Sequence, residues 1–263
     1  MTTVTVFNAR ELEDKVKAMY RDVAEKPHGK YHFEMGRALA ERLGYAGADL
    51  DRIPKEAIDS FAGVGHYFHL ADLDEGETVV DFGSGSGMDT FVAALKVGPR
   101  GRVVGVDMTD AQRKKAESLR DRDGFRTVTY VKGYIEEAPL PDACADVVIS
   151  NGVFNLAPDK LKVFQEVARV LKPGGRMAIA DIVTDMQLPE TISCNTTLWA
   201  ACIGGAAQRD SYRSMIEAAG LRVSNVEDNP AYQFISDSAL GATKKYGVKS
   251  VSVLATKPGE LVA

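Results

Sequence analysis

The sequence has little cysteine and no long apolar run, and each absence excludes a class of proteins. The 263 residues include three cysteines, Cys144, Cys194 and Cys202, an odd and small number that argues against a disulfide framework. No stretch is long and apolar enough to cross a bilayer. Residues 1–10 lack the charged and apolar regions of a secretory signal. We therefore expect a cytoplasmic protein that does not enter a membrane.

Basic clusters and a complete set of metal ligands are also missing. The formal net charge is −5, and no long run of lysine and arginine occurs. Because tight non-specific binding to a phosphate backbone depends on such runs, we expect no nucleic-acid partner. As a metal site, His66 and His69 form a His-x-x-His pair without a third ligand, so we expect no bound metal. The oligomeric state is left open.

What is present is an alternation of strand-like and helix-like patterns. This pattern predicts a doubly wound α/β fold, with a parallel sheet and helices on both faces. The expected strands are 78–82, 102–107, 127–131, 146–150, 176–181, 221–226 and 249–256. The expected helices are 9–24, 32–43, 88–97, 110–121, 159–171 and 210–219, with a sharp turn at Lys172-Pro173-Gly174-Gly175.

Two parts of the chain stand apart from this alternation. Residues 1–70 are helix-prone, and we expect them to form an N-terminal cap or lid on a main domain at residues 71–263. An insertion at about residues 182–208 follows the fifth expected strand and contains Cys194, Trp199 and Cys202. Long irregular segments at the carboxyl end of a parallel sheet are usually functional. We therefore expect the insertion to contribute to a site.

The most informative stretch is residues 79–87, which read Val-Val-Asp-Phe-Gly-Ser-Gly-Ser-Gly. An apolar strand ends in Asp81 and breaks into alternating glycines before a helix. Glycine lets a ligand approach the backbone closely because it has no Cβ. A helix N-terminus offers unpaired N–H groups and a partial positive charge to an anion. The stretch therefore predicts a ligand-binding turn.

The spacing of the glycines indicates which ligand binds there. Gly83, Gly85 and Gly87 follow the pattern G-x-G-x-G, whereas the dinucleotide fingerprint is G-x-G-x-x-G. A carboxylate at Asp81 suits an ammonium group better than a diphosphate. The second strand ends in Asp107-Met108, where an acid can bind a ribose diol and methionine can pack on a base. Amino acid, ribose and adenine together describe S-adenosylmethionine.

These residues, with the turn at 171–175, resemble the class I S-adenosylmethionine-dependent methyltransferases over roughly residues 71–257. The resemblance implies a Rossmann-like sheet of seven strands with the last one antiparallel. It implies S-adenosylmethionine as cofactor and places Tyr134, Ile135 and Glu136 beside adenine, although many members have Asp where this chain has Tyr134. Asn151 follows the fourth strand and is either a contact for cofactor or acceptor, or a turn residue. The implied cofactor site is Asp81, Gly83, Ser84, Gly85, Ser86, Gly87, Asp107, Met108, Tyr134, Ile135, Glu136 and Asn151.

Further segments, among them 105–110, 155–160 and 198–206, resemble the arsenite methyltransferase group. That resemblance implies a trivalent arsenic acceptor held by cysteine thiolates, which are soft ligands. Cys202 matches a family cysteine, and Cys194 could supply a second thiolate. The family has a further cysteine where this chain has Gly152, and another upstream of the glycine turn, where this chain has none. Two thiolates could hold a metalloid that arrives with another thiol attached.

Gly152 in place of a family cysteine keeps a second function open, and the fold itself leaves a third one open. The chain could methylate an organic small molecule at sulfur, oxygen, nitrogen or carbon, with His66 as a base in the segment before the first strand. It could also bind the cofactor without catalysis, because a fold does not determine a function. For Cys144, which precedes a strand, we expect a structural role as a small buried hydrophobe.

Overall fold

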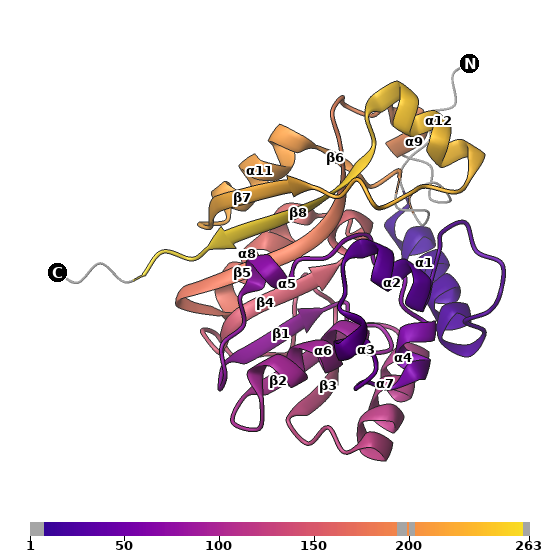
Figure 1. Cartoon of the computed structure of the whole chain (residues 1–263). Helices are drawn as coiled ribbons and strands as arrows, with labels where there is room; N and C mark the ends of the chain where they lie inside the picture. The colour runs from indigo at the N-terminus through magenta and orange to yellow at the C-terminus, as the bar shows by residue number, and fades with distance from the viewer. Residues whose placement is uncertain (1–7, 194–198, 200–202, 260–263) are drawn as a thin grey trace.

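The computed structural model describes residues 8–193, 199 and 203–259. Its strands form one sheet in the order β3-β2-β1-β4-β5-β8-β7, and the short β6 pairs with β5 (Figure 1). β8 runs antiparallel to both β5 and β7, so the predicted doubly wound sheet with an antiparallel last strand is confirmed. The strands are β1 (Thr78–Phe82), β2 (Arg102–Asp107), β3 (Val128–Lys132), β4 (Ala145–Asn151), β5 (Leu171–Thr184), β6 (Ala207–Gln208), β7 (Arg222–Asp228) and β8 (Lys249–Thr256).

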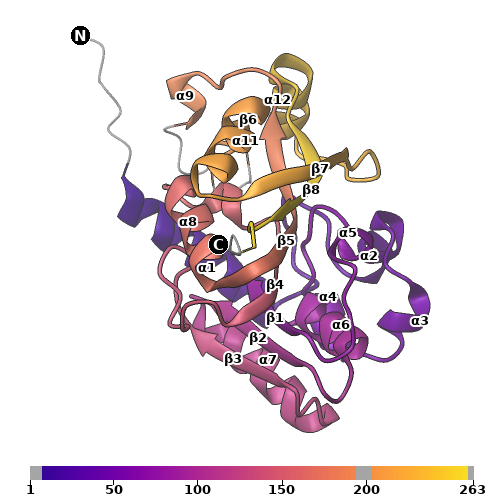
Figure 2. The ribbon, with the colours of Figure 1, turned by 90° about the vertical axis from the view of Figure 1, so that its left-hand side faces the viewer.

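Helices cover both faces of the sheet, as Figure 2 shows with the sheet seen nearly edge-on. One face carries α8 and α11, and the other carries α6 and the short N-terminal helices α2 to α5. The helices are α1 (Ala9–Glu25), α2 (Arg37–Leu43), α3 (Gly47–Leu50), α4 (Lys55–Asp59), α5 (Phe68–Ala71), α6 (Met88–Val97), α7 (Asp110–Asp123), the 3₁₀ helix η1 (Phe154–Leu156), α8 (Lys160–Val170), α9 (Glu190–Ser193), α11 (Arg209–Ala218) and α12 (Asp237–Tyr246).

The core is divided by the sheet into two halves. Val79 of β1 packs into the half that faces α6, whereas Val80 and Phe82 pack into the half that faces α8. Successive side chains of a strand point to opposite faces, and both faces are covered here. A continuous apolar run, rather than an alternating one, is therefore the sequence signature of this central strand.

Three local predictions need correction. The helix expected from residue 32 begins only at Arg37, because Gly36 has a φ of +84° and interrupts it. The turn expected at 172–175 lies inside β5, which already pairs with β4 at Leu171 and shifts register after Ala145. α12 was not expected; its apolar residues are too few and too scattered for a clear helical stripe.

The order of the strands decides where a ligand can bind. The chain moves from β1 to β2 and β3 on one side, then returns to place β4 and β5 on the other side of β1. Loops that leave the carboxyl ends of β1 and β4 therefore diverge and leave a crevice between them. The glycine turn after β1 and Asn151 at the end of β4 border this crevice.

Candidate functional site

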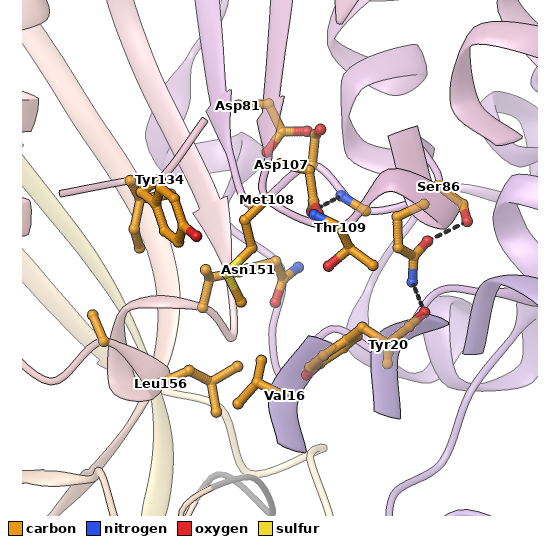
Figure 3. A pocket seen from close by; sticks show the side chains of 18 of the residues that line it. Val16, Tyr20, Asp81, Ser86, Asp107, Met108, Thr109, Tyr134, Asn151 and Leu156 are labelled. Carbon is orange, nitrogen blue, oxygen red and sulfur yellow. Dashed lines mark hydrogen bonds between the residues drawn. The ribbon is translucent and has the colours of Figure 1, made fainter. Parts of the chain in front are cut away.

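A cavity of about 240 Å³ lies at this crevice and is closed on its outer side by α1. Figure 3 shows Val16 and Tyr20 of α1 on the side opposite Asp81, with Met108 and Asn151 between them. The cavity is lined by loops after β1, β2, β3 and β4, by α1, and by residues around α4. All twelve residues predicted to bind the cofactor border it except Gly87, which is the N-cap of α6 directly beside it.

The glycine turn has a backbone that other residues would adopt only with strain. Gly83, Gly85 and Gly87 have φ values of +73°, +53° and +95°. A Cβ on Gly83 would lie 2.4 Å from Val153 Cγ2, and a Cβ on Gly87 would lie 2.2 Å from the Tyr130 hydroxyl. Both conformation and space therefore require glycine at these two positions.

The turn also leaves polar groups available to a ligand. The Ser84 hydroxyl borders the cavity and is buried, with no hydrogen-bond partner among the described residues. Gly87 gives α6 no side-chain cap, so the first N–H groups of the helix are not satisfied in that way. An anionic or polar group of a ligand fits here. These observations match the carboxylate and amino group of an amino-acid cofactor.

Asp107 at the end of β2 is held in place by the backbone. Gly85 N–H donates to Oδ2 at 2.9 Å, and Thr109 N–H donates to Oδ1 at 2.7 Å. Burial raises the pKa of Asp107, against the lowering effect of these donors. Each carboxylate oxygen can accept a second hydrogen bond. The carboxylate is thus oriented and can still bind the two hydroxyls of a ribose.

Asp81 and Asp89 form a second acidic region of the cavity. The Thr90 hydroxyl donates to Asp81 Oδ2 at 2.6 Å. Burial raises the pKa of Asp81 well above its usual value, and the nearby charge of Asp89 adds to this. The sequence had identified Asp81. It had missed Asp89, because a single acid in the first turn of a helix is common and needs no ligand to explain it.

The environment of Asp89 is a network that joins distant parts of the chain. Tyr45 and Tyr67 donate through their hydroxyls to Oδ1 and Oδ2, each at 2.6 Å. The Asn151 side-chain amide donates to Oδ2 at 3.1 Å. Burial raises the pKa of Asp89, and these three donors act in the opposite direction. No local sequence signal links these four residues.

Asn151 borders the cavity, but its amide is occupied by the protein. Its Nδ2 donates to the Tyr45 hydroxyl and to Gly65 O, both at 3.0 Å, and its Oδ1 accepts from Val64 N–H at 2.8 Å. Asn151 thereby ties the end of β4 to the segment before β1. Its predicted contact with cofactor or acceptor stays a prediction.

Tyr134 connects the loop after β3 to α1. Its hydroxyl donates to Glu13 at 2.7 Å and accepts from Lys17 Nζ at 2.9 Å. The hydrogen bond from Lys17 lowers the pKa of Glu13. Its neighbours Ile135 and Glu136 also border the cavity, and burial raises the pKa of Glu136. Tyr134 thus holds the covering helix against the loop after β3.

A second contact joins α1 to the glycine turn. The Ser86 hydroxyl donates to Gln112 Oε1, and Gln112 Nε2 donates to Tyr20 O at 2.9 Å, as the dashed lines in Figure 3 show. Gln112 is 2% exposed. Helix α1 is therefore fixed on both sides of the cavity.

The structure does not bring His66 to the cavity lining. Its ring stacks on His69 at 5.4 Å between ring centroids and meets Tyr45 edge-on at 4.8 Å. Burial lowers the pKa of His66 to about 4, so the imidazole is neutral at pH 7. This placement does not support the predicted role as a base, which stays untested.

The predicted acceptor residues Cys194 and Cys202 lie outside the described residues. The described neighbours Trp199 and Gly205 pack against Asn155 of η1. Trp199 Nε1 donates to Asn155 O at 2.9 Å, and a Cβ on Gly205 would overlap that oxygen. Cys144, by contrast, is half-buried at the start of β4, where it packs against the core away from the cavity lining.

Residues 8–193, 199 and 203–259 contain no group of three acidic, histidine or cysteine side chains placed to bind a metal ion. Within the same ranges, none of the helices has the length and apolarity needed to cross a membrane.

Comparison with known proteins places this geometry in a family. Residues 73–220 match the model of a methyltransferase domain. The arsenite methyltransferase of Halobacterium salinarum is 39% identical over 199 residues, which are 75% of this chain and 51% of that protein. Human arsenite methyltransferase is 44% identical over 137 residues, 49% of this chain and 36% of that protein. This chain thus spans about half the length, or less, of these curated relatives.

Solved structures give the same result. The crystal structure of an arsenic(III) S-adenosylmethionine methyltransferase from Chlamydomonas reinhardtii aligns with a TM-score of 0.66 and 32% identity, covering 86% of this chain and 74% of that one. Together with the glycine turn and the acid after β2, these matches confirm the resemblance found in the sequence. The chain belongs to the class I S-adenosylmethionine-dependent methyltransferases, in the group close to the arsenite methyltransferases.

Proposed function

We propose that this protein transfers a methyl group from S-adenosylmethionine to trivalent arsenic or to a similar soft, thiol-bound acceptor. The observation that carries the proposal is the 32% identity, over 86% of this chain, to an arsenic(III) methyltransferase of known structure. The bound cofactor supplies a methyl group on a positively charged sulfur, which a lone pair of the acceptor can attack.

The residues of the cavity hold and orient the cofactor. Asp107 would bind the ribose hydroxyls, and the residues from Gly83 to Gly87 would bind the amino-acid end. Met108 and Ile135 would pack on the adenine ring. Helix α1 covers the cavity and excludes water, so that reactants are held together in a fixed arrangement.

A soft acceptor suits a cavity lining whose described residues include no histidine or lysine. Arsenic(III) attacks through its own lone pair, so the reaction needs no proton removed from the acceptor. Cys202 and Cys194 are the thiolates that we propose to hold it. Position 152 supplies no third thiolate, because it is Gly152, whose φ is +71°. We therefore propose an acceptor that arrives with a small thiol attached.

The test is methylation of arsenite in the presence of glutathione and S-adenosylmethionine, followed by mass spectrometry. We expect methylated arsenic from the parent protein and much less from Cys194→Ser and Cys202→Ser. Cys144→Ser is the matched control, because Cys144 packs away from the cavity lining and its loss should leave the yield unchanged. Equal yields from all three variants would contradict the thiolate mechanism.

The second candidate is methylation of an organic small molecule. The observation that favours it is the apolar wall formed by Leu12, Val16, Phe61 and Leu156 in a lining whose described residues include no cysteine. A panel of small thiols and phenols in the same assay distinguishes the two functions. Product with an organic acceptor and none with arsenite would replace the first proposal. If no methylated product forms with either class of acceptor, non-catalytic binding of the cofactor would be favoured.

We also propose that residues 1–70 act as the lid of this site and that the protein is cytoplasmic. Support for the lid comes from α1, which borders the cavity with Ala9, Leu12, Glu13, Val16 and Tyr20. Support for the location comes from the proposed thiolates, which a reducing compartment keeps available.

A further inference from the structure

The cavity is strongly one-sided in charge. Its lining includes the carboxyl groups of Glu13, Asp81, Asp89, Asp107 and Glu136, and no lysine, arginine or histidine from the described residues. Glu13 is paired with Lys17, which lies outside the lining. The carboxyl groups deep in the cavity have no such partner within the described ranges. A ligand that carries positive charge would complement this lining.

The carboxyl group of Asp89 is held by neutral donors, which act against the rise in its pKa that burial causes. Its carboxylate receives hydrogen bonds from three donors, the hydroxyls of Tyr45 and Tyr67 and the amide of Asn151. Hydrogen bonds that point toward a carboxylate favour its charged form. Asp89 is only 6% exposed, and both tyrosines are more deeply buried. The charge is thus fixed in position by neutral groups alone.

Such an arrangement is costly without a cationic ligand. Removing a carboxylate from water is unfavourable unless an opposite charge compensates it. The groups that face Asp89 are Asp81 from β1, the two tyrosines from the N-terminal segment and Asn151 from β4. None of them is a cation. The methyl donor has one more positive charge than its product, because the sulfonium becomes a neutral thioether on transfer.

We propose that Asp89, held by Tyr45, Tyr67 and Asn151, is the counter-charge for the sulfonium of the cofactor. Through this charge, Asp89 makes the cavity bind the methyl donor, with its sulfonium, more tightly than the demethylated product, with its neutral thioether. The inference depends on the cofactor and not on the proposed arsenic acceptor, so either can fail without the other.

The test is calorimetric titration of S-adenosylmethionine, S-adenosylhomocysteine and sinefungin, in which an amine replaces the sulfonium. Asp89→Asn keeps the size of the side chain and removes its charge. We expect S-adenosylmethionine and sinefungin to bind about tenfold to a hundredfold more weakly, the loss of one charge-assisted contact. S-adenosylhomocysteine should change by less than about threefold.

Asp107→Asn is the matched control, because the ribose is the same in all three ligands. It should weaken the three to the same extent. Equal weakening of all three ligands by Asp89→Asn would overturn the proposal, since it would place Asp89 at the shared amino-acid end or give it a purely structural role.

A second pair of variants covers the case in which Asp89→Asn does not fold. Tyr45→Phe and Tyr67→Phe each remove one donor to Asp89, and this raises the pKa of the carboxyl. We expect the pH below which S-adenosylmethionine affinity declines to move upward in both variants, with the S-adenosylhomocysteine profile unmoved. Unchanged profiles for both ligands would contradict the role of Asp89.

Discussion

Replacing Gly87 by alanine should damage the fold and the cofactor site together. Gly87 has a φ of +95°, a conformation that costs a residue with a Cβ about 1–2 kcal/mol. Its new Cβ would also lie 2.2 Å from the Tyr130 hydroxyl and 2.9 Å from Phe91 Cε2. Both rings are buried, so relieving the overlap costs roughly a further 1–3 kcal/mol. The expected loss in the free energy of unfolding is about 2–5 kcal/mol.

Gly124 provides a matched control for the backbone contribution. It also has a positive φ, +76°, but a Cβ there would meet nothing within 4 Å. Gly124→Ala should therefore cost only the conformational strain of about 1–2 kcal/mol. The difference between the two variants measures the steric overlap at the glycine turn.

Urea denaturation of both variants, with and without S-adenosylmethionine, is the assay. Addition of Tyr130→Phe to Gly87→Ala removes the nearest atom and should recover part of the loss. Gly124→Ala should keep its affinity for the cofactor. Gly87→Ala should lose that affinity, because the glycine turn must shift to make room for the alanine side chain. If the two alanine variants unfold at the same urea concentration and bind the cofactor equally well, the steric reasoning is wrong.

Three further predictions concern charge. Asp107→Ala should weaken the binding of S-adenosylmethionine by about 1–3 kcal/mol, because buried donors are left unpaired. An unchanged dissociation constant would exclude the ribose contact. The folded pKa values of Asp81 and Asp107 are raised, so between about pH 3.9 and these raised values the cofactor-free native state holds protons on the two carboxyl groups that the unfolded state has lost. Its free energy of unfolding should then fall as pH rises through this window, and Asp81→Asn should flatten the slope measured by urea titration. Lys17→Ala removes a hydrogen-bond donor to Tyr134. Cofactor release, measured by stopped flow, should become about two- to fivefold faster. Lys15→Ala breaks an ion pair elsewhere on α1 and should leave the release rate unchanged.

Local patterns predicted the central elements well. The predicted bounds of β1, β2, α6 and β8 agree with the structure at both ends. Each is a short apolar or helix-prone segment ended by glycine or a charged residue, so neighbouring residues alone decide its limits. The cofactor turn followed from the same local information, because positive φ and glycine go together.

Elements that depend on distant contacts were less well predicted. β5 begins earlier than its composition suggests because Leu171 pairs with Ala145 of a neighbouring strand. α2 begins later because Gly36 adopts a positive φ and its N–H donates to Phe61 O, twenty-five residues away. In both cases a partner far along the chain sets the boundary, and no local pattern contains that partner.

The sequence by itself determined the fold class, the cofactor and the residues of the glycine turn, because these follow from short-range spacing and from glycine conformation. Only the tertiary structure placed Tyr45, Tyr67 and Asn151 around Asp89. It also placed α1 across the cavity, where Glu13 accepts a hydrogen bond from the Tyr134 hydroxyl. These contacts join segments separated by twenty to more than a hundred residues. Their geometry arises from the order in which the strands assemble, so the charge of the site becomes visible only once the sheet is formed.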